Sequence, residues 1–393
     1  MTLPIQASDN GHPAIDILIS DFTYFGAQRI AVIAANGLAS RGYKVRFVVL
    51  RDEGPFSSHL SAGIERLELL ASDLWTPPPH TQLLTAAYRY RRACRNDRER
   101  IVISFSPVTN ALALAATLGK SSQHCVLQEH AHQGVAIEDS TSYSRQFTLF
   151  YKKLLARSYR FADHLIFVSD SARQYLVTQY RLPASKASTI YNPIDMNSVG
   201  ILGEGATPEW PPAGGLRIIA VGRLAPQKNF HRFLSVLARL RDRAPHFDFD
   251  AAILGDGPDR DSLLTRVKEL GLEERVRFIG FQENHYPYIR SADVICLTSE
   301  WEGLPYVLAE AMTLKTVVVA HDCPSGPSEM IRAEAGILTP FADIDAMAQA
   351  LEALGDETLR SRMSVRGLEV CQELYDTNTY LNKCEEIFAS ILV

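Results

Sequence analysis

Two carboxylates, Glu302 and Glu310, lie eight residues apart around a segment that is otherwise almost wholly apolar. The run from Tyr306 to Leu314 leaves no polar stripe and Pro305 suits a first helical turn, so the segment predicts a buried helix. An unpaired buried carboxylate is costly, and Glu310 therefore needs a protein base or a pair of ligand hydroxyls as its partner. Because the N–H groups at a helix start are free, the start of this helix favours an anion. The segment indicates two hydroxyl-binding carboxylates on either side of an anion site.

A second group of polar residues follows a predicted strand at 217–221. Gly222 gives the backbone a wider choice of conformations there. Arg223 and Lys228 place two cations just before a predicted helix at Phe230–Arg243. Arg grips phosphate oxygens with two parallel hydrogen bonds, while Lys adds a point charge. An isolated pair of this kind is usually two solvated surface cations. The helix start and the two carboxylates downstream favour a pyrophosphate site instead.

Two other strand ends carry weaker signals. Gly255-Asp-Gly257 is a lone GxG, which favours a tight turn over a phosphate loop. The segment that ends at Gly280 and Phe281 offers backbone groups that could meet the edge of a nucleobase. Neither segment identifies a ligand by itself.

The composition bounds the class of protein. At 393 residues the chain is long enough for two domains, and its apolar and charged fractions are those of a soluble globular protein. The net charge of −5 gives no nucleic-acid signature. Six scattered cysteines without a CxxC pair indicate reduced thiols in a cytoplasmic protein. We find no signal-peptide layout at the N-terminus and no apolar run of the roughly 20 residues that span a bilayer.

Short β-rich runs alternate with helical patterns along the whole chain, which predicts parallel sheets built from βαβ units. A Gly- and Pro-rich break at 203–215 separates two such alternations and predicts a linker. Two doubly wound α/β sheets imply a ligand cleft at the carboxyl ends of their strands. The predicted strands are 15–19, 45–50, 101–104, 125–128, 165–168 and 188–191, then 217–221, 249–254, 276–279, 294–297 and 317–320.

These segments together resemble the GT4 family of retaining glycosyltransferases, which have the GT-B fold of two Rossmann-like domains. The resemblance rests on Gly-Arg-Leu…Lys-Asn at 222–229, Leu-Gly-Asp-Gly-Pro at 254–258, Phe-Ile-Gly at 278–280 and Glu-Gly-Leu-Pro…Glu-Ala-Met at 302–312. The first half matches more loosely through Gly26-Ala-Gln-Arg-Ile, and the family commonly has paired glycines where this chain has Phe25-Gly26. The resemblance implies an acceptor domain at 1–196, a nucleotide-sugar domain at 197–375, and a C-terminal helix from about 376 that packs back on the first domain.

The resemblance also implies a role for each matching residue. The donor pyrophosphate would lie against Arg223 and Lys228, with Gly222 beside them. Glu310 would bind the ribose hydroxyls and Glu302 the donor sugar. The remaining expected contacts are the backbone N–H groups of Gly303 and Leu304 near the phosphates or sugar, Phe281 near the base, Gly26 across the cleft, and His130 beside the reacting sugar, with His132 as a weaker candidate.

Retention at the anomeric carbon would follow from the same resemblance, with the acceptor attacking on the face that the phosphate leaves. The departing phosphate would take the proton, so no nucleophile is nominated, Cys323 included. Arg223 and Lys228 could stabilise the developing charge without a metal. The two Asp-x-Asp pairs, Asp248-Phe-Asp250 and Asp343-Ile-Asp345, are interpreted as solvated or capping residues, so we expect no cofactor or metal.

The expected donor is a nucleotide diphosphate sugar, with UDP favoured, and the acceptor a glycan or polyprenyl-diphosphate-linked glycan. The loop at 322–329 resembles a variant from enzymes that build bacterial surface polysaccharides, many with N-acetylhexosamine donors. Basic amphipathic stretches at 144–159 and 88–95 suit either an ordinary solvated face or peripheral contact with the inner membrane surface. Two alternatives stay open: an enzyme of the UDP-N-acetylglucosamine 2-epimerase type, and a catalytically silent glycosyltransferase-like binding protein.

Overall fold

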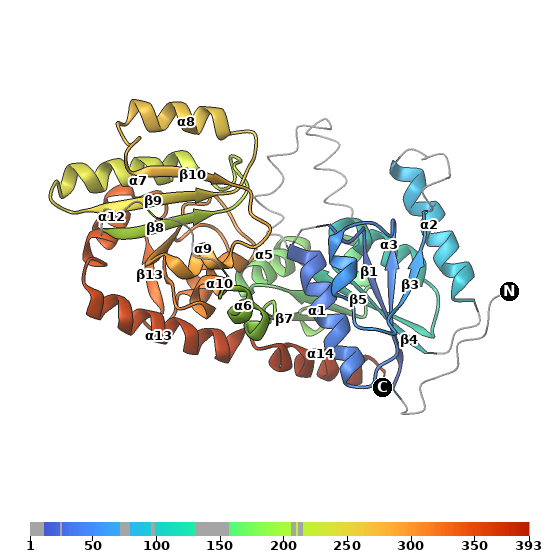
Figure 1. The fold of residues 1–393 in the computed structure, drawn as a ribbon. Helices are drawn as coiled ribbons and strands as arrows, with labels where there is room; N and C mark the ends of the chain where they lie inside the picture. Colours follow the sequence, from blue (N-terminus) through green and yellow to red (C-terminus); the bar gives the residue numbers. More distant parts are fainter. Residues whose placement is uncertain are drawn as a thin grey trace. The chain divides into compact units, whose positions relative to one another are not determined.

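A computed structural model describes residues 12–23, 26–70, 79–95, 99–130, 157–205, 210 and 215–392. The chain forms two compact units (Figure 1). The first contains the residues up to Pro193 together with Thr377–Val393, and the second contains Ile194–Asp376. Within the described ranges, no helix is long and apolar enough to cross a bilayer.

The first unit is built on a seven-stranded sheet in the order β3-β2-β1-β4-β5-β6-β7, with every neighbouring pair parallel. Parallel strands need crossover connections, and helices supply most of them. Its strands are β1 (Ala14–Ile19), β2 (Val45–Val49), β3 (Glu65–Glu68), β4 (Arg100–Ser104), β5 (Gln123–Glu129), β6 (His164–Phe167) and β7 (Ala187–Thr189). Its helices are α1 (Gly26–Ser40), α2 (Pro79–Ala93), α3 (Pro107–Thr117), α5 (Asp170–Tyr180) and α14 (Thr377–Ile391), with short 3-10 turns at Pro55–His59, Tyr159–Phe161 and Ala184–Lys186.

The second unit has a six-stranded parallel sheet in the order β10-β9-β8-β11-β12-β13. Its strands are β8 (Leu216–Val221), β9 (Phe249–Leu254), β10 (Val276–Gly280), β11 (Val294–Leu297), β12 (Val317–His321) and β13 (Gly336–Thr339). Its helices are α6 (Met196–Leu202), α7 (Phe230–Arg243), α8 (Arg260–Glu269), α9 (Tyr286–Ser291), α10 (Tyr306–Thr313), α11 (Pro327–Met330), α12 (Ile344–Ala353) and α13 (Glu357–Leu374).

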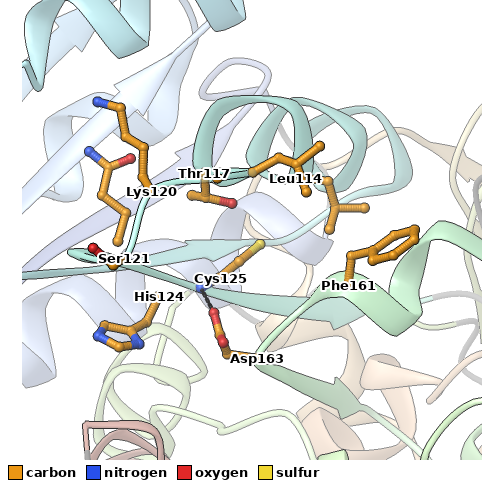
Figure 2. Close-up of a pocket in the computed structure, with 11 residues that line it drawn as sticks. Leu114, Thr117, Lys120, Ser121, His124, Cys125, Phe161 and Asp163 are labelled. Atoms are coloured by element: carbon orange, nitrogen blue, oxygen red, sulfur yellow. Dashed lines mark hydrogen bonds between the residues drawn. The ribbon is translucent and has the colours of Figure 1, made fainter.

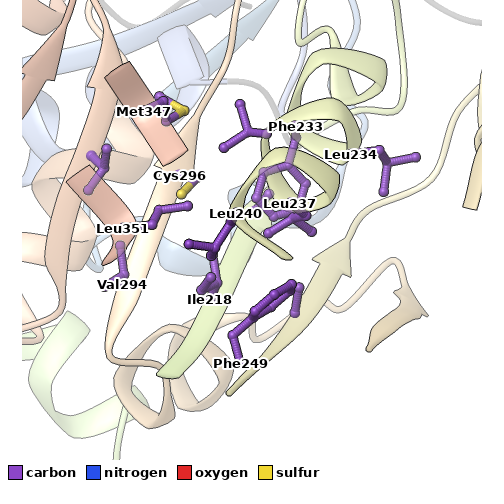
Figure 3. Packing of buried hydrophobic residues seen from close by; sticks show 14 of the residues in the cluster. Ile218, Phe233, Leu234, Leu237, Leu240, Phe249, Val294, Cys296, Met347 and Leu351 are labelled. Atoms are coloured by element: carbon purple, nitrogen blue, oxygen red, sulfur yellow. The ribbon is translucent and has the colours of Figure 1, made fainter. Parts of the chain in front are cut away.

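One face of the second sheet forms the main core of that unit with α7 and α12 (Figure 3). Every second residue of β8 and β9 points into this core, as the period of two in a strand requires. From α7 the apolar residues Phe233, Leu237 and Leu240 pack against Ile218 and Phe249. This packing fixes the start of α7, which places the segment with Arg223 and Lys228 at the carboxyl end of β8.

The last helix, α14, belongs to the first unit although it follows the second in sequence. The Tyr380 hydroxyl donates to Gln128 Oε1 at 3.0 Å, which joins α14 to β5. Arg41, just after α1, pairs with Glu385 at 2.5 Å. The chain therefore crosses between the units twice.

Some predicted elements differ from those in the structure. Edge strands β3 and β13 and helix α2 were missing from the prediction, and α10 begins at Tyr306 with Pro305 as its N-cap residue. The basic amphipathic stretch at 144–159 lies mostly outside the described residues. The interpretation of Asp250 as solvated or capping was wrong, since it lies within β9 with 3% of its surface exposed.

Candidate active site

The segment between β11 and α10 is anchored to the start of α7 by several hydrogen bonds. Arg232 pairs with Glu300 at 2.6 Å, and Asn229 donates to the same carboxylate. The backbone N–H of Glu300 donates to the carbonyl of Gln227 at 2.8 Å, and Gln227 Nε2 returns a bond to the carbonyl of Trp301 at 3.0 Å. Glu300 is therefore a structural carboxylate, and its network brings the next one, Glu302, beside Lys228.

Glu302 is buried and its two carboxylate oxygens have different surroundings. Oε1 accepts from Lys228 Nζ at 2.6 Å and from Ser299 Oγ at 2.6 Å. Within the part of the chain that the structure describes, Oε2 accepts no hydrogen bond. A carboxylate oxygen accepts hydrogen bonds, so Oε2 is suited to a ligand hydroxyl. The Lys228 ammonium has three N–H donors and can bind a phosphate while it keeps Glu302.

The backbone at Gly303 is held by the loop after β12. The Ser325 hydroxyl donates to the Gly303 carbonyl at 2.9 Å, and the N–H of Glu302 donates to the Pro324 carbonyl at 3.2 Å. Gly326 adopts φ 97°, and a Cβ there would fall 2.5 Å from Pro305 Cδ, so only glycine allows this approach. Among the described residues, the N–H groups of Gly303 and Leu304 donate to no protein acceptor. Both are available to an anion or a sugar oxygen.

Three glycines bring the loops after β8 and β9 into contact. A Cβ on Gly255 would lie 1.9 Å from the Gly222 carbonyl oxygen, and a Cβ on Gly257 would lie 2.3 Å from the Leu224 carbonyl oxygen. The Gly255-Asp-Gly257 segment thus lets two backbones approach closely, which goes further than the tight turn that we predicted. Arg223 lies between these contacts, is exposed, and makes no ion pair within the described residues. Its guanidinium is free to meet a ligand anion.

Glu310 has protein partners that the sequence did not identify. It lies on α10 with 3% of its surface exposed. His285 Nε2 lies 2.9 Å from Oε2, and the Tyr286 hydroxyl donates to Oε1 at 3.2 Å. In the sequence, these partners were indicated only by the general rule that a buried carboxylate needs a partner. Near the same loop, Phe281 follows β10 and is 63% exposed, so its ring is available to a flat ligand.

The first unit holds the other two predicted positions. His130 directly follows β5, with its ring stacked on Phe105 at 5.7 Å between centroids. Burial lowers the pKa of His130 to about 3, so the ring is neutral at physiological pH. Its Nε2 atom is buried and has no partner among the described residues. Gly26 begins α1, and a Cβ there would meet nothing within 4 Å. His132 lies outside the described residues.

A different hollow, of about 210 Å³, lies in the first unit between the end of α3 and the start of β5 (Figure 2). Asp163 there accepts a hydrogen bond from the N–H of Cys125 at 2.7 Å. None of the predicted site residues lines this hollow. We therefore place the candidate site at the carboxyl ends of the strands, in agreement with the general position of ligands in open α/β sheets.

The structure thus joins Lys228 directly to Glu302, and it places Gly303 and Leu304 next to them. Glu310 forms a separate cluster with His285 and Tyr286 on the same unit. Sequence reasoning missed His285, Tyr286 and Ser299. Ser299 could have been found by its i, i+3 spacing from Glu302, but the two partners of Glu310 are brought to it by tertiary structure alone.

The two Asp-x-Asp pairs have structural contacts. Asp343 is the N-cap of α12 and accepts from the N–H of Ala346 at 2.9 Å, as expected of a capping residue. Asp248 pairs with Arg275 at 2.9 Å at the start of β9. No group of three metal-ligating side chains occurs in the described part of the chain.

Solved structures with this arrangement define the class of fold. Anabaena Alr3699/HepE in complex with UDP aligns with a TM-score of 0.74 at 20% identity, covering 96% of this chain and 100% of that chain. TarM from S. aureus aligns with a TM-score of 0.78 at 12% identity, covering 96% of this chain and 99% of the other. The protein has the GT-B fold that the sequence predicted.

Sequence relatives define the family. Residues 25–198 match the model of "Glycosyltransferase Family 4" and residues 210–369 match "Glycosyl transferases group 1". A Campylobacter jejuni relative, N-acetylgalactosamine-N,N'-diacetylbacillosaminyl-diphospho-undecaprenol 4-alpha-N-acetylgalactosaminyltransferase, is 30% identical over 278 residues, which cover 70% of this chain and 72% of the relative. The amylovoran biosynthesis glycosyltransferase AmsD of Erwinia amylovora is 33% identical over 148 residues, 38% of this chain and 41% of that protein. The chain belongs to the family 4 glycosyltransferases and is an enzyme of the transferase class.

Proposed function

We propose that this protein is a retaining, metal-independent glycosyltransferase of surface polysaccharide or lipid-linked glycan biosynthesis. Its donor is a nucleotide diphosphate sugar, with a UDP-hexose or UDP-N-acetylhexosamine favoured. Its acceptor is a glycan, free or linked to a polyprenyl diphosphate. The names of relatives support this acceptor class, because the Campylobacter jejuni enzyme is named for a diphospho-undecaprenol substrate and AmsD for amylovoran biosynthesis.

The observation that carries the proposal is the asymmetric carboxylate of Glu302. Lys228 and Ser299 both bind its Oε1, while Oε2 has no partner among the described residues. A donor sugar hydroxyl would complete Oε2, and the phosphates next to that sugar would lie against Lys228. Arg223 and the N–H groups of Gly303 and Leu304 would complete the diphosphate contacts.

The reaction follows from this placement of charge. The bond between the anomeric carbon and the β-phosphate oxygen breaks, and the acceptor hydroxyl forms the new bond on the same face. The acceptor proton passes to the departing phosphate oxygen, so the products are the glycoside and the nucleoside diphosphate. Arg223 and Lys228 stabilise the negative charge that grows on the diphosphate. Neutral His130 would act as a hydrogen-bond partner of the sugar, because its lowered pKa disfavours the charged form.

A donor screen tests this proposal directly. UDP-, GDP-, ADP- and dTDP-sugars are compared by thermal shift and by slow hydrolysis, in EDTA and then with added Mg²⁺. We expect one UDP-sugar to raise the melting temperature in EDTA, with slow release of UDP. Turnover that requires the added metal would contradict metal independence, and failure of every donor to bind would contradict the transferase site.

The stereochemistry and the reaction class need a second measurement with the donor so identified. Anomeric proton couplings of the product report retention or inversion. Appearance of an epimerised sugar without an acceptor would support the 2-epimerase alternative and contradict the transfer reaction. Binding without any turnover, across a panel of polyprenyl-diphosphate-linked glycans, would favour a silent binding protein.

We also propose that the enzyme works at the cytoplasmic face of the membrane, where a lipid-linked acceptor would be presented. One face of α2 exposes Leu84 and Tyr88, and the chain then continues with exposed Arg92 and Arg95. Nearby, Arg91 donates to the carbonyl of Leu118, the residue that follows α3. Apolar side chains beside cations suit an anionic lipid surface.

Sedimentation with vesicles tests the membrane contact. We expect the protein to bind vesicles that contain phosphatidylglycerol more than vesicles of phosphatidylcholine, and the double variant Leu84→Gln/Tyr88→Gln to bind less. Val365→Gln on the second unit is a matched control, because Val365 is also an exposed apolar residue on a helix. Equal binding by all three proteins would contradict this surface.

A further inference from the structure

The hollow between α3 and β5 (Figure 2) is a concave site of the first unit, apart from the proposed transfer site. Its volume is about 210 Å³, and residues at the start of β5 line it. His130 instead follows the last residue of β5. A strand of seven residues spans roughly 20 Å. A ligand in the hollow would therefore lie outside the transfer site.

Two residues that line the hollow have oxygens available to a hydrogen-bond donor. Gln123 is 5% exposed, and its Oε1 atom is buried without a hydrogen-bond partner in the described part of the chain. Such an atom is costly until a donor reaches it. Asp163 Oδ2 accepts from the N–H of Cys125 at 2.7 Å, whereas Oδ1 accepts no hydrogen bond among the described residues. Both oxygens can accept from the hydroxyls of a ligand.

The hollow also has an apolar end. Leu114 and Phe161 lie at one end of it, and Lys120 and Ser121 lie at the other (Figure 2). Phe161 is 65% exposed, so the ring can pack against a ligand with little change in the fold. Sites for small molecules usually combine apolar walls with a few polar groups that fix the orientation of the ligand. The hollow has this composition.

The charges around the hollow favour a neutral ligand. The Asp163 carboxylate and the Gln123 carbonyl oxygen repel an anion, and the Lys120 ammonium repels a cation. The available oxygens need O–H or N–H donors, and the exposed ring of Phe161 needs an apolar partner. A pyranose ring supplies both, because hydroxyls surround its edge and C–H groups cover its faces.

We propose that this hollow is a second carbohydrate-binding site, which holds one sugar ring of the glycan acceptor outside the transfer site. Gln123 and Asp163 accept hydrogen bonds from hydroxyls of this ring, and Phe161 packs against one of its faces. That the ring is part of the acceptor rests on the proposed function, whereas the binding of a sugar does not. A glycan that is held both here and at the transfer site binds more tightly than one held at a single site.

Titrations followed by saturation-transfer NMR test the inference. The probes are the methyl glycosides of glucose, galactose, N-acetylglucosamine and N-acetylgalactosamine, each with and without UDP. We expect at least one probe to bind the wild type. Phe161→Ala should weaken this binding about 3- to 10-fold, as fits the loss of one aromatic contact. Asp163→Asn keeps an acceptor for Cys125 and should weaken it about 10- to 100-fold, because a hydrogen bond to a charged group is lost.

Gln123→Met separates ligand binding from general damage to the fold. It removes the buried unpaired oxygen and nearly keeps the size of the side chain, so the melting temperature should stay the same or rise. Binding of the methyl glycoside should nevertheless weaken about 3- to 10-fold through the lost hydrogen bond. Tyr175→Ala is the matched control, since Tyr175 is an exposed aromatic residue on α5 that does not line the hollow. It should bind the probe as the wild type does.

The outcomes distinguish this inference from the proposed function. Binding of no methyl glycoside by the wild type would overturn it, and so would an affinity unchanged in Phe161→Ala, Asp163→Asn and Gln123→Met. Uridine or glycerol that binds in place of the glycosides, with the same sensitivity to the three variants, would assign the hollow to another ligand and also overturn it. Failure of UDP to bind the folded wild type would remove the proposed function. A glycoside that still loses affinity in the three variants would then keep this site.

Discussion

Asp16 in the first unit and Glu302 in the second are both buried carboxylates, but they lie at opposite ends of their sheets. In the first unit Asp16 lies near the start of β1, where Arg46 binds both of its oxygens at 3.0 and 2.8 Å. Arg100 and the Tyr90 hydroxyl add bonds at 2.6 and 2.7 Å. In the second unit Glu302 follows the carboxyl end of β11 and has partners on one oxygen only. Burial alone therefore does not identify a functional carboxylate.

The two carboxylates differ in whether their protein partners leave an oxygen available to a ligand. Asp16 is enclosed by two guanidinium groups and a phenol, and has no exposed surface. The same cluster raises the pKa of Tyr90 well above its ordinary value, first by burial and then through the charge of Asp16, so the phenol remains a donor. We infer that this end of the first sheet holds the fold together, and that the carboxyl ends of the strands in the second unit are kept incomplete for ligand.

Replacement of Asp16 should have the largest effect on stability. Asp16→Asn leaves the Arg46 and Arg100 charges buried without their anion, and breaking such a pair costs about 3–5 kcal/mol. Chemical denaturation of the first unit measures the loss. Asp52→Asn is the matched control, since its pair with Arg66 is exposed and should be worth at most about 1 kcal/mol. Similar losses in the two variants would remove the distinction between the two ends of the sheets.

Replacement of Arg223 should reduce turnover, because this residue lies at the carboxyl ends of the strands in the second unit, where we place the functional site. Arg223→Ala should lower kcat by about 10²–10³-fold, the usual cost of one lost charge-stabilising donor, with the melting temperature unchanged. Arg243→Ala, which removes a partly exposed partner of Glu352, should leave turnover unchanged. Turnover at the wild-type rate in Arg223→Ala would contradict the assignment of this side chain to the diphosphate.

Glu302→Gln sharpens the comparison with Asp16, because both variants change a buried carboxylate to its amide. Loss of hydrogen bonds to a charged acceptor should weaken transition-state binding by about 1.5–3 kcal/mol. The free energy of unfolding should change much less than in Asp16→Asn, since Lys228 is 20% exposed and can be hydrated. Rates of transfer and unfolding curves measure the two effects. A stability loss equal to that of Asp16→Asn would contradict a primarily functional role.

The sequence predicted the elements that carry a strong local pattern. Strands β9 and β11 and helix α7 have the predicted bounds, because the strands are short, mostly apolar runs and α7 repeats its apolar residues at helical spacing. Strand β3 was missed because Glu65-Arg-Leu-Glu68 is a charged edge strand with no apolar alternation. Strand β13 begins at a glycine, where a Cβ would fall 2.4 Å from Val318, so its place depends on its neighbour in the sheet.

The candidate site was predictable to the same extent. The positions of Arg223, Lys228 and Glu302 at strand-to-helix turns, and of Glu310 on a buried helix, follow from local pattern and from the family resemblance. The bond between Lys228 and Glu302 joins residues 74 positions apart, and that between His285 and Glu310 joins residues 25 apart. Such contacts are set by strand order and loop packing, which one sequence does not give. Asp250 shows the same limit, since its burial depends on the strands on either side of β9.

Replacement of Asp250 should have the smallest effect on stability, and the sign of this effect should be opposite to that of Asp16→Asn. It lies at the same end of its sheet as Asp16, but no side-chain hydrogen bond to it occurs among the described residues. Burial raises the pKa of Asp250, and the Asp248 carboxylate adds to the increase.

A carboxyl whose pKa is higher in the folded state destabilises the fold once it ionises, so this penalty grows as the pH rises above the unfolded value of about 4. Asp250→Asn should therefore stabilise the second unit slightly at pH 7, and the gain should shrink below pH 4. Destabilisation at pH 7 would show that Asp250, like Asp16, is a carboxylate on which the fold depends.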